Sequence, residues 1–129
     1  MNFYIKKDST LPTLKYSLDQ EFLDKYGLAD EDMNDAAVTF SMYNVDTEEY
    51  HIANVSGQIK YRNDNDYLAV PKYSIEYEFK LGDTAVVGNY YGEFKLDFLN
   101  VNFPMKISIP NSGYIDMTVF DSLTKTSLY

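Results

Sequence analysis

The stretch Tyr90–Phe98 reads Tyr-Tyr-Gly-Glu-Phe-Lys-Leu-Asp-Phe and alternates between two kinds of position. Its even-numbered positions are apolar or glycine, whereas Glu93, Lys95 and Asp97 carry charges on the odd-numbered ones. A period of two residues with one apolar and one charged face is the pattern of a β-strand that covers one side of a core. We therefore expect a strand here and build the fold outward from it.

Alternating runs also lie on both sides of this strand. In residues 73–80 apolar side chains alternate with polar ones, and the turn signal Leu81-Gly82-Asp83-Thr84 follows. A break at Ile109-Pro110-Asn111-Ser112-Gly113 precedes residues 114–120, which alternate again. Because residues two apart share one face of a strand, we expect the following set to lie inside the protein: Tyr90, Phe94, Leu96, Ile115, Met117 and Val119.

The N-terminal half holds shorter segments of the same kind. Strands are predicted at residues 3–5, 14–18 and 38–42, and residues 52–55 and 59–61 are interpreted as a hairpin turned at Ser56-Gly57. One short helix is expected over 19–27, because Asp19 can cap its start and Gly27 suits a left-handed end. Asn63–Lys72 is interpreted as a polar loop, and Leu99–Met105 as a longer connection.

About seven or eight short strands with turn signals between them are typical of a sandwich or barrel. Gly88-Asn89-Tyr90 stands where an immunoglobulin-like sandwich has its tyrosine corner, and the alternative is that Tyr90 is only a core aromatic. The sequence therefore predicts an all-β fold, an immunoglobulin-like antiparallel β-sandwich with one short helical insert. The sandwich domain is expected over residues 1–120 and a C-terminal tail over 121–129.

The composition limits the range of partners. The chain has 129 residues, the size of one domain, and a formal net charge of −9. Such a charge is repelled by phosphate backbones and anionic lipids, so we expect no nucleic-acid and no membrane partner. We interpret the acidity as a solubility feature, with an acidic patch for a basic partner as the alternative. The 13 Tyr and 8 Phe favour strands, and so many Tyr are also typical of protein–protein interfaces.

The same composition bears on the compartment. With no cysteine, the chain has neither disulfides nor thiolate metal sites. Its first residues, Met-Asn-Phe-Tyr-Ile-Lys-Lys, lack the apolar stretch of a signal peptide, and no window has the length of a spanning helix. We therefore expect a soluble protein made in a cytosol.

No residue set predicts catalysis, a cofactor or a metal. His51 is the only histidine and has no cysteine near it, so it is interpreted as a surface or hairpin residue. Asp30-Glu31-Asp32 and Asp35 lie in a polar stretch, and Asn63-Asp64-Asn65-Asp66 lacks the glycine and the distal Glu of a calcium loop. A carboxylate pair for glycoside hydrolysis stays open, because separation in space is not visible in a sequence. We expect no enzyme.

Three further stretches form a recognisable pattern when they are taken in order. The opening, residues 3–14, reads Phe-Tyr-Ile-Lys-Lys-Asp-Ser-Thr-Leu-Pro-Thr-Leu, and the middle is Leu81-Gly82-Asp83-Thr84 followed by residues 88–94, Gly-Asn-Tyr-Tyr-Gly-Glu-Phe. The close, residues 109–115, reads Ile-Pro-Asn-Ser-Gly-Tyr-Ile. Together the three stretches bracket nearly the whole chain, and in this order they resemble the N-terminal domain of phage baseplate upper proteins. The helical insert and the connection after Phe98 are longer than the family pattern.

This resemblance implies an immunoglobulin-like adaptor that docks onto other virion proteins without enzyme activity. We therefore expect a structural component of a tailed bacteriophage, in its tail or baseplate, made in the host cytoplasm and located in the virion. Its expected partners are other virion proteins and its own copies in a symmetric assembly. The edge near Phe3–Lys6 and the tail Asp121–Tyr129 are the predicted docking elements, through strand addition.

A second function, from another class, is a carbohydrate- or receptor-binding sandwich module. In that case exposed tyrosines such as Tyr91 or Tyr50 would stack on the ligand. A sandwich fold hosts both functions, so the fold does not decide between them.

Overall fold

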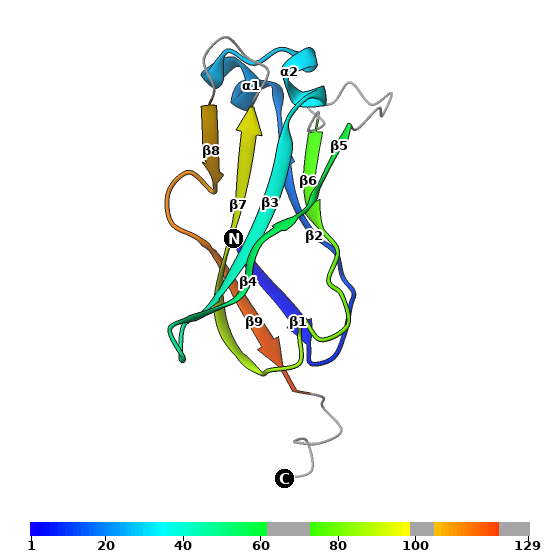
Figure 1. Ribbon diagram of the computed structural model, residues 1–129, viewed down its shortest axis with the longest axis vertical. Coiled ribbons are helices and arrows are strands. Elements are labelled where there is room, and N and C mark those ends of the chain that lie inside the picture. Colours follow the sequence, from blue (N-terminus) through cyan, green and yellow to red (C-terminus); the bar gives the residue numbers. More distant parts are fainter. Residues whose placement is uncertain (62–72, 99–104, 122–129) are drawn as a thin grey trace.

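Two β-sheets face each other in the computed structural model, which describes residues 1–61, 73–98 and 105–121 (Figure 1). The larger sheet contains β1 (Asn2–Lys6), β3 (Ala37–Asn44), β4 (Glu49–Ser56), β7 (Gly88–Phe98), β8 (Met105–Ile109) and β9 (Ile115–Phe120). The smaller sheet contains β2 (Leu14–Leu18), β5 (Gln58–Tyr61) and β6 (Tyr73–Tyr77). Two short helices, α1 (Gln20–Tyr26) and α2 (Asp30–Asn34), lie together at one end of the sandwich (Figure 1).

The strand order is that of an immunoglobulin-like sandwich. The larger sheet runs β1-β9-β7-β3-β4 and the smaller one β2-β6-β5. In the strand letters of the immunoglobulin fold, the smaller sheet β2-β6-β5 corresponds to B-E-D. In the larger sheet, β3, β7 and β9 correspond to C, F and G. The described strands all pair in antiparallel fashion except β1 with β9, which are parallel. The predicted fold class is confirmed.

β7 is paired along both of its edges. On one side it runs against β3 from Asn44↔Tyr90 to Ala37↔Asp97. On the other side β9 covers its first half, Gly88–Gly92, and β8 covers its second half, Phe94–Phe98. The break predicted at residues 109–113 separates these two strands, and Pro110 has no backbone N–H with which to continue the ladder. β8 is the strand that the sequence patterns left unassigned.

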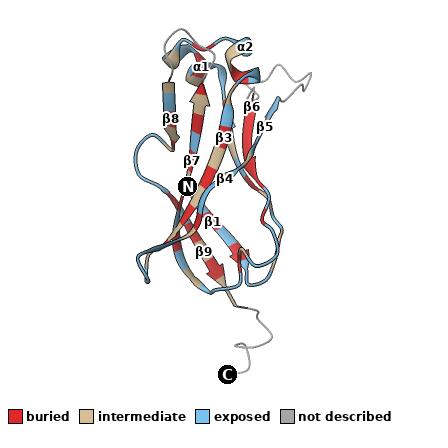
Figure 2. Cartoon of the chain, in the orientation of Figure 1, coloured by how far each residue is buried: buried red, intermediate tan, exposed pale blue. Residues whose placement is uncertain are grey.

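The core lies between the two sheets (Figure 2). All six residues predicted to be inside are buried, and Lys95 on the opposite face of β7 is exposed. Phe40 stands at the centre of the core, with its ring 4.6 Å from that of Tyr77 and 5.1 Å from that of Phe94. The contact with Tyr77 joins the larger sheet to the smaller one. Hydrophobic burial across this layer is the main stabilising term of the fold.

β6 departs from the simple alternation. Its apolar positions are buried as predicted, but Ser74 and Glu76 on the other face are buried as well. The Glu76 carboxylate lies 3.2 Å from Nζ of Lys60 on the neighbouring strand β5. A buried carboxylate that keeps a cationic partner avoids much of the desolvation penalty of an isolated charge.

The predicted hairpin at Ser56-Gly57 is wrong. β4 pairs with β3 in the larger sheet, whereas β5 pairs with β6 in the smaller sheet, so the chain crosses between sheets at Gly57. A Cβ atom on Gly57 would stand 2.8 Å from the carbonyl oxygen of Glu76. Only glycine leaves room for this close approach to β6. In the sequence, a glycine at such a site cannot be told apart from the glycine of a tight turn.

The helical insert is confirmed at its first helix and extended by a second one. Asp19 accepts a hydrogen bond from the backbone N–H of Phe22 at 2.9 Å, and Gly27 ends α1 with a left-handed φ of 64°. α2 was not predicted, because its five residues bury only Met33 and show no helical period. The carboxylate of Asp32 accepts from the N–H of Ala29, which explains part of the acidic stretch as helix capping.

The tyrosine corner is present. The Tyr90 hydroxyl donates to the carbonyl oxygen of Val86 at 2.6 Å, and the Tyr90 side chain is buried at the start of β7. The preceding turn is also held by side chains: Asp83 accepts from the Lys80 N–H at 2.8 Å, and the Thr84 hydroxyl donates to the Ser9 carbonyl at 2.7 Å. The Leu81–Thr84 motif thus serves the fold by joining the turn before β7 to the segment after β1.

Several expectations fall on residues that the structure does not describe. These are the loop Asn63–Lys72 with its Asn63–Asp66 stretch, the connection at residues 99–104 and the tail residues 122–129. Within the described ranges, no helix is long and apolar enough to cross a membrane.

The first prediction concerns the core. Phe94→Ala should lower the free energy of unfolding by about 3–5 kcal/mol, because it removes a fully buried ring between Phe40 and the rest of the core. Urea denaturation followed by circular dichroism measures the loss. Lys95→Ala, an exposed position on the same strand, should change stability by less than about 0.5 kcal/mol. Equal effects of the two substitutions would contradict the register of β7.

Candidate functional site

Four tyrosines gather on the outer surface of the larger sheet. Tyr50 of β4, Tyr43 of β3 and Tyr91 of β7 are direct neighbours in the strand registers, and Tyr114 precedes β9. The rings of Tyr43 and Tyr50 meet edge to face at 5.2 Å, and those of Tyr91 and Tyr114 stack at 5.0 Å with an interplanar angle of 20°. We call these four residues the tyrosine face.

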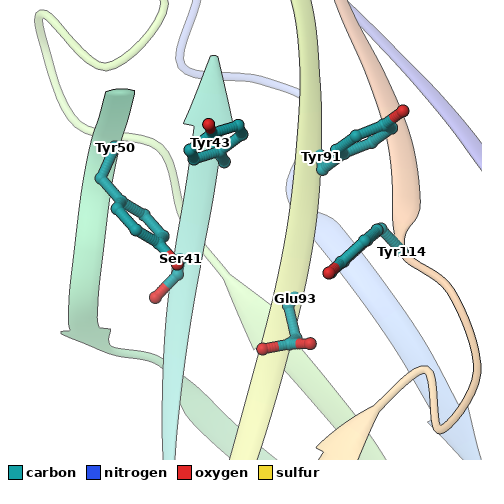
Figure 3. A pocket seen from close by; sticks show the side chains of 6 residues that line it. All are labelled: Ser41, Tyr43, Tyr50, Tyr91, Glu93 and Tyr114. Atoms are coloured by element: carbon teal, nitrogen blue, oxygen red, sulfur yellow. The ribbon is translucent and has the colours of Figure 1, made fainter. Parts of the chain in front are cut away.

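The tyrosine face surrounds an open hollow of about 360 Å³. Ser41 and Glu93, which oppose each other on β3 and β7, complete its lining. Tyr50 reaches from β4 towards Ser41, and Tyr114 reaches from the segment before β9 towards Glu93 (Figure 3). We call this hollow the tyrosine pocket. It combines two aromatic walls with a carboxylate and a hydroxyl, a mixture that is typical of ligand and interface pockets.

Strand alternation explains why these side chains point outward. On β3, Phe40 and Met42 are buried, so Ser41 and Tyr43 lie on the other face. On β7 the buried neighbours of Tyr91 and Glu93 are Tyr90, Gly92 and Phe94. The same two-residue period that fills the core therefore also builds the pocket.

The hydroxyl groups divide the tyrosines into two kinds. In the core, Tyr73 donates to Asp30 at 2.8 Å, Tyr77 to Asp83 at 2.7 Å and Tyr90 to the Val86 carbonyl at 2.6 Å. In contrast, none of the four hydroxyls of the tyrosine face donates to another residue of the described chain. Core tyrosines serve the fold, whereas the hydroxyls of the tyrosine face are available to a ligand or to water.

The core hydroxyls are also electrostatically distinct. Burial, reinforced by hydrogen bonds to Asp30 and Asp83, raises the pKa of Tyr73 and Tyr77 above the ordinary tyrosine range. Burial also raises the pKa of Tyr90. In each case a low-polarity surrounding disfavours the phenolate.

The other candidate residues considered in the sequence lie outside the tyrosine pocket. His51, which is half-buried, lies on β4 with Nε2 2.7 Å from the Asp83 carbonyl oxygen and its ring 5.7 Å from that of Tyr90. Among the described residues no group of three or more His, Cys, Asp or Glu could hold a metal. Within the described part of the chain, Glu93 is the one carboxylate that lines the tyrosine pocket, so these residues do not form the carboxylate pair of a glycosidase there.

The sequence anticipated half of the tyrosine face. It named Tyr91 and Tyr50 as exposed rings, and both are exposed, whereas Tyr43, Tyr114 and the polar residues were not singled out. Outward positions can be read from alternation, but the pairing of β3 with both β4 and β7 cannot. Among the described strands β1 lies at one edge of the larger sheet, as predicted, and its use as a docking element stays a prediction.

Comparisons with family models, with curated proteins and with solved structures found no match to this chain. The resemblance to phage baseplate upper proteins therefore rests on its three sequence stretches.

The second prediction concerns alkaline stability. Because the pKa values of Tyr73 and Tyr77 are raised in the folded state, folding stabilises their neutral phenols. This contribution to the free energy of unfolding is fully present below the ordinary tyrosine pKa of about 10. It is lost as the pH rises from there towards the folded-state values. The urea midpoint should therefore fall above about pH 10. Tyr77→Phe should flatten that fall, while Tyr91→Phe, on the tyrosine face, should leave its slope unchanged.

Proposed function

We propose that this chain is a non-enzymatic structural component of a tailed bacteriophage virion, an adaptor domain in the tail or baseplate assembly. The observation that carries its docking role is the tyrosine face, four clustered rings whose hydroxyls have no partner in the described chain. Clustered surface aromatics on a small domain are typical of protein-binding surfaces. The virion setting comes from the resemblance of the three sequence stretches.

The fold supports an adaptor in a second way. Edge strands present unpaired backbone groups to which another chain can add a strand. β1 is such an edge, and only β9 lies between it and β7, the strand that carries Tyr91 of the tyrosine face. One domain thus offers two different surfaces, which suits a component that contacts both its own copies and other virion proteins.

The third prediction tests the proposal in particles. Mass spectrometry of purified intact virions should detect the chain in multiple copies per particle. Tyr50→Ala should reduce its incorporation, because Tyr50 is a 67% exposed wall of the tyrosine pocket. Tyr61→Ala is the matched control, since Tyr61 is 56% exposed but lies on β5 in the other sheet. Presence of the chain only in lysates of infected cells, and not in virions, would contradict the proposal.

A second candidate function is a carbohydrate- or receptor-binding module. The observation that favours it is the proximity of aromatic walls to the polar groups of Ser41 and Glu93 in one open pocket. Sugar rings can stack on tyrosines while their hydroxyls bond to such groups.

The fourth prediction separates this candidate from the first. If the pocket binds a glycan, an array should yield hits with the unmodified chain that are lost with Tyr91→Ala and kept with Tyr61→Ala. Hits that survive both substitutions would place glycan binding elsewhere on the protein. An array without hits would remove the candidate.

A further inference from the structure

We infer that the tyrosine pocket binds a cationic side chain of a partner protein, with arginine preferred. The inference rests on the proposed function and names the chemical group by which the partner docks on the tyrosine face. It is carried by the walls of the pocket, by its single fixed charge and by the balance of charge around it.

The walls of the pocket are aromatic. Two tyrosine pairs stand on opposite sides of the pocket, one contributed by β3 and β4 and the other by β7 and the segment before β9 (Figure 3). A cation over the face of a tyrosine is attracted by the negative potential of the ring. The planar guanidinium of arginine also stacks on such a face, which an ammonium cannot do.

The fixed charge of the pocket is negative. Among the described residues that line it, Glu93 is the one ionisable group besides the tyrosines. Its carboxylate forms no ion pair with any residue that the structure describes. A guanidinium can donate to both oxygens of a carboxylate while its plane rests on a neighbouring ring, so Glu93 and Tyr114, which reaches towards it (Figure 3), can hold the same group.

The charged residues closest to the pocket also favour a cationic guest. Asp116 of β9 is exposed and directly opposes Tyr91 in the strand register, which places a second carboxylate beside the pocket. Lys95, the next outward residue of β7 after Glu93, lines a separate hollow together with Asp97 and Lys106. There the Nζ of Lys106 lies 3.9 Å from Asp97.

The whole chain adds a long-range attraction of the same sign. Its formal net charge of −9 favours encounter with basic partners and disfavours acidic ones. The described residues that line the pocket offer hydroxyls and a carboxylate but no basic or amide side chain. A neutral ligand would leave that carboxylate partly desolvated without a counter-charge, whereas a cation supplies one.

A peptide titration tests the inference on the full chain. An acetylated and amidated Gly-Arg-Gly peptide should shift the backbone amide resonances of Tyr43 and Tyr91 in nuclear magnetic resonance spectra. The same peptide with citrulline, which is nearly isosteric but uncharged, should bind about tenfold more weakly, because it lacks both the cation–ring attraction and the ion pair. A lysine peptide should fall between them.

Two charge-neutralising variants locate the effect. Glu93→Gln should raise the dissociation constant of the arginine peptide by about three- to fivefold through loss of the ion pair. Asp97→Asn is its matched control, because it removes one negative charge from the same face of β7 outside the pocket, and it should leave binding unchanged. Matching circular dichroism spectra verify that both variants fold.

The outcomes separate this inference from the proposed function. Equal binding of the arginine and citrulline peptides, or equal weakening by Glu93→Gln and Asp97→Asn, would overturn the cationic pocket. A glycan that shifts the same amides while the arginine peptide does not would also overturn it. Virion content is measured independently, so the chain can be a virion component whether or not the pocket binds arginine.

Discussion

The structure depends on the alternation of β7, because this strand is paired along both edges and is used on both faces. β3 lies along one edge, and β8 and β9 share the other. Its inner face contributes the fully buried Phe94 and Leu96 to the core, and its outer face contributes Tyr91 and Glu93 to the tyrosine pocket. A shift of one residue would exchange these faces, placing charges in the core and apolar rings in water. Stability and the candidate site are therefore set by one register.

The two kinds of tyrosine show how one residue type serves two purposes. A phenol ring buries a large apolar area, but its hydroxyl needs a partner once it is removed from water. Tyr77 meets this need with Asp83, an acceptor that also caps its own turn, and Tyr90 meets it with the Val86 carbonyl. On the outer surface water can satisfy the hydroxyl, so rings such as Tyr50 can be displayed without an internal acceptor. The high tyrosine content is thus explained in part by the buried tyrosines of the core and in part by the exposed tyrosine face.

The tyrosine pocket is built mainly on strands rather than on loops. Most of its lining residues stand on the paired strands β3, β4 and β7, where backbone hydrogen bonds hold their Cα positions. Sites on strands are more rigid than sites on loops, so less conformational entropy is lost on binding. Tyr114, outside the strands, is held by its stack on Tyr91. A rigid aromatic surface is suited to repeated contacts of one geometry.

The sequence by itself determined most strands with one apolar face, the caps of α1 and the position at which a tyrosine corner can form. These features depend on residues near one another in the chain, such as Asp19 with Phe22 and Tyr90 with Val86. Only the tertiary structure decided which strands pair. Gly57 carries the local signal of a hairpin, yet its function is a close passage by Glu76, a contact set by packing of distant segments. For the same reason the tyrosine pocket was not visible in the sequence, since its walls come from strands whose neighbours are selected by burial of the opposite face.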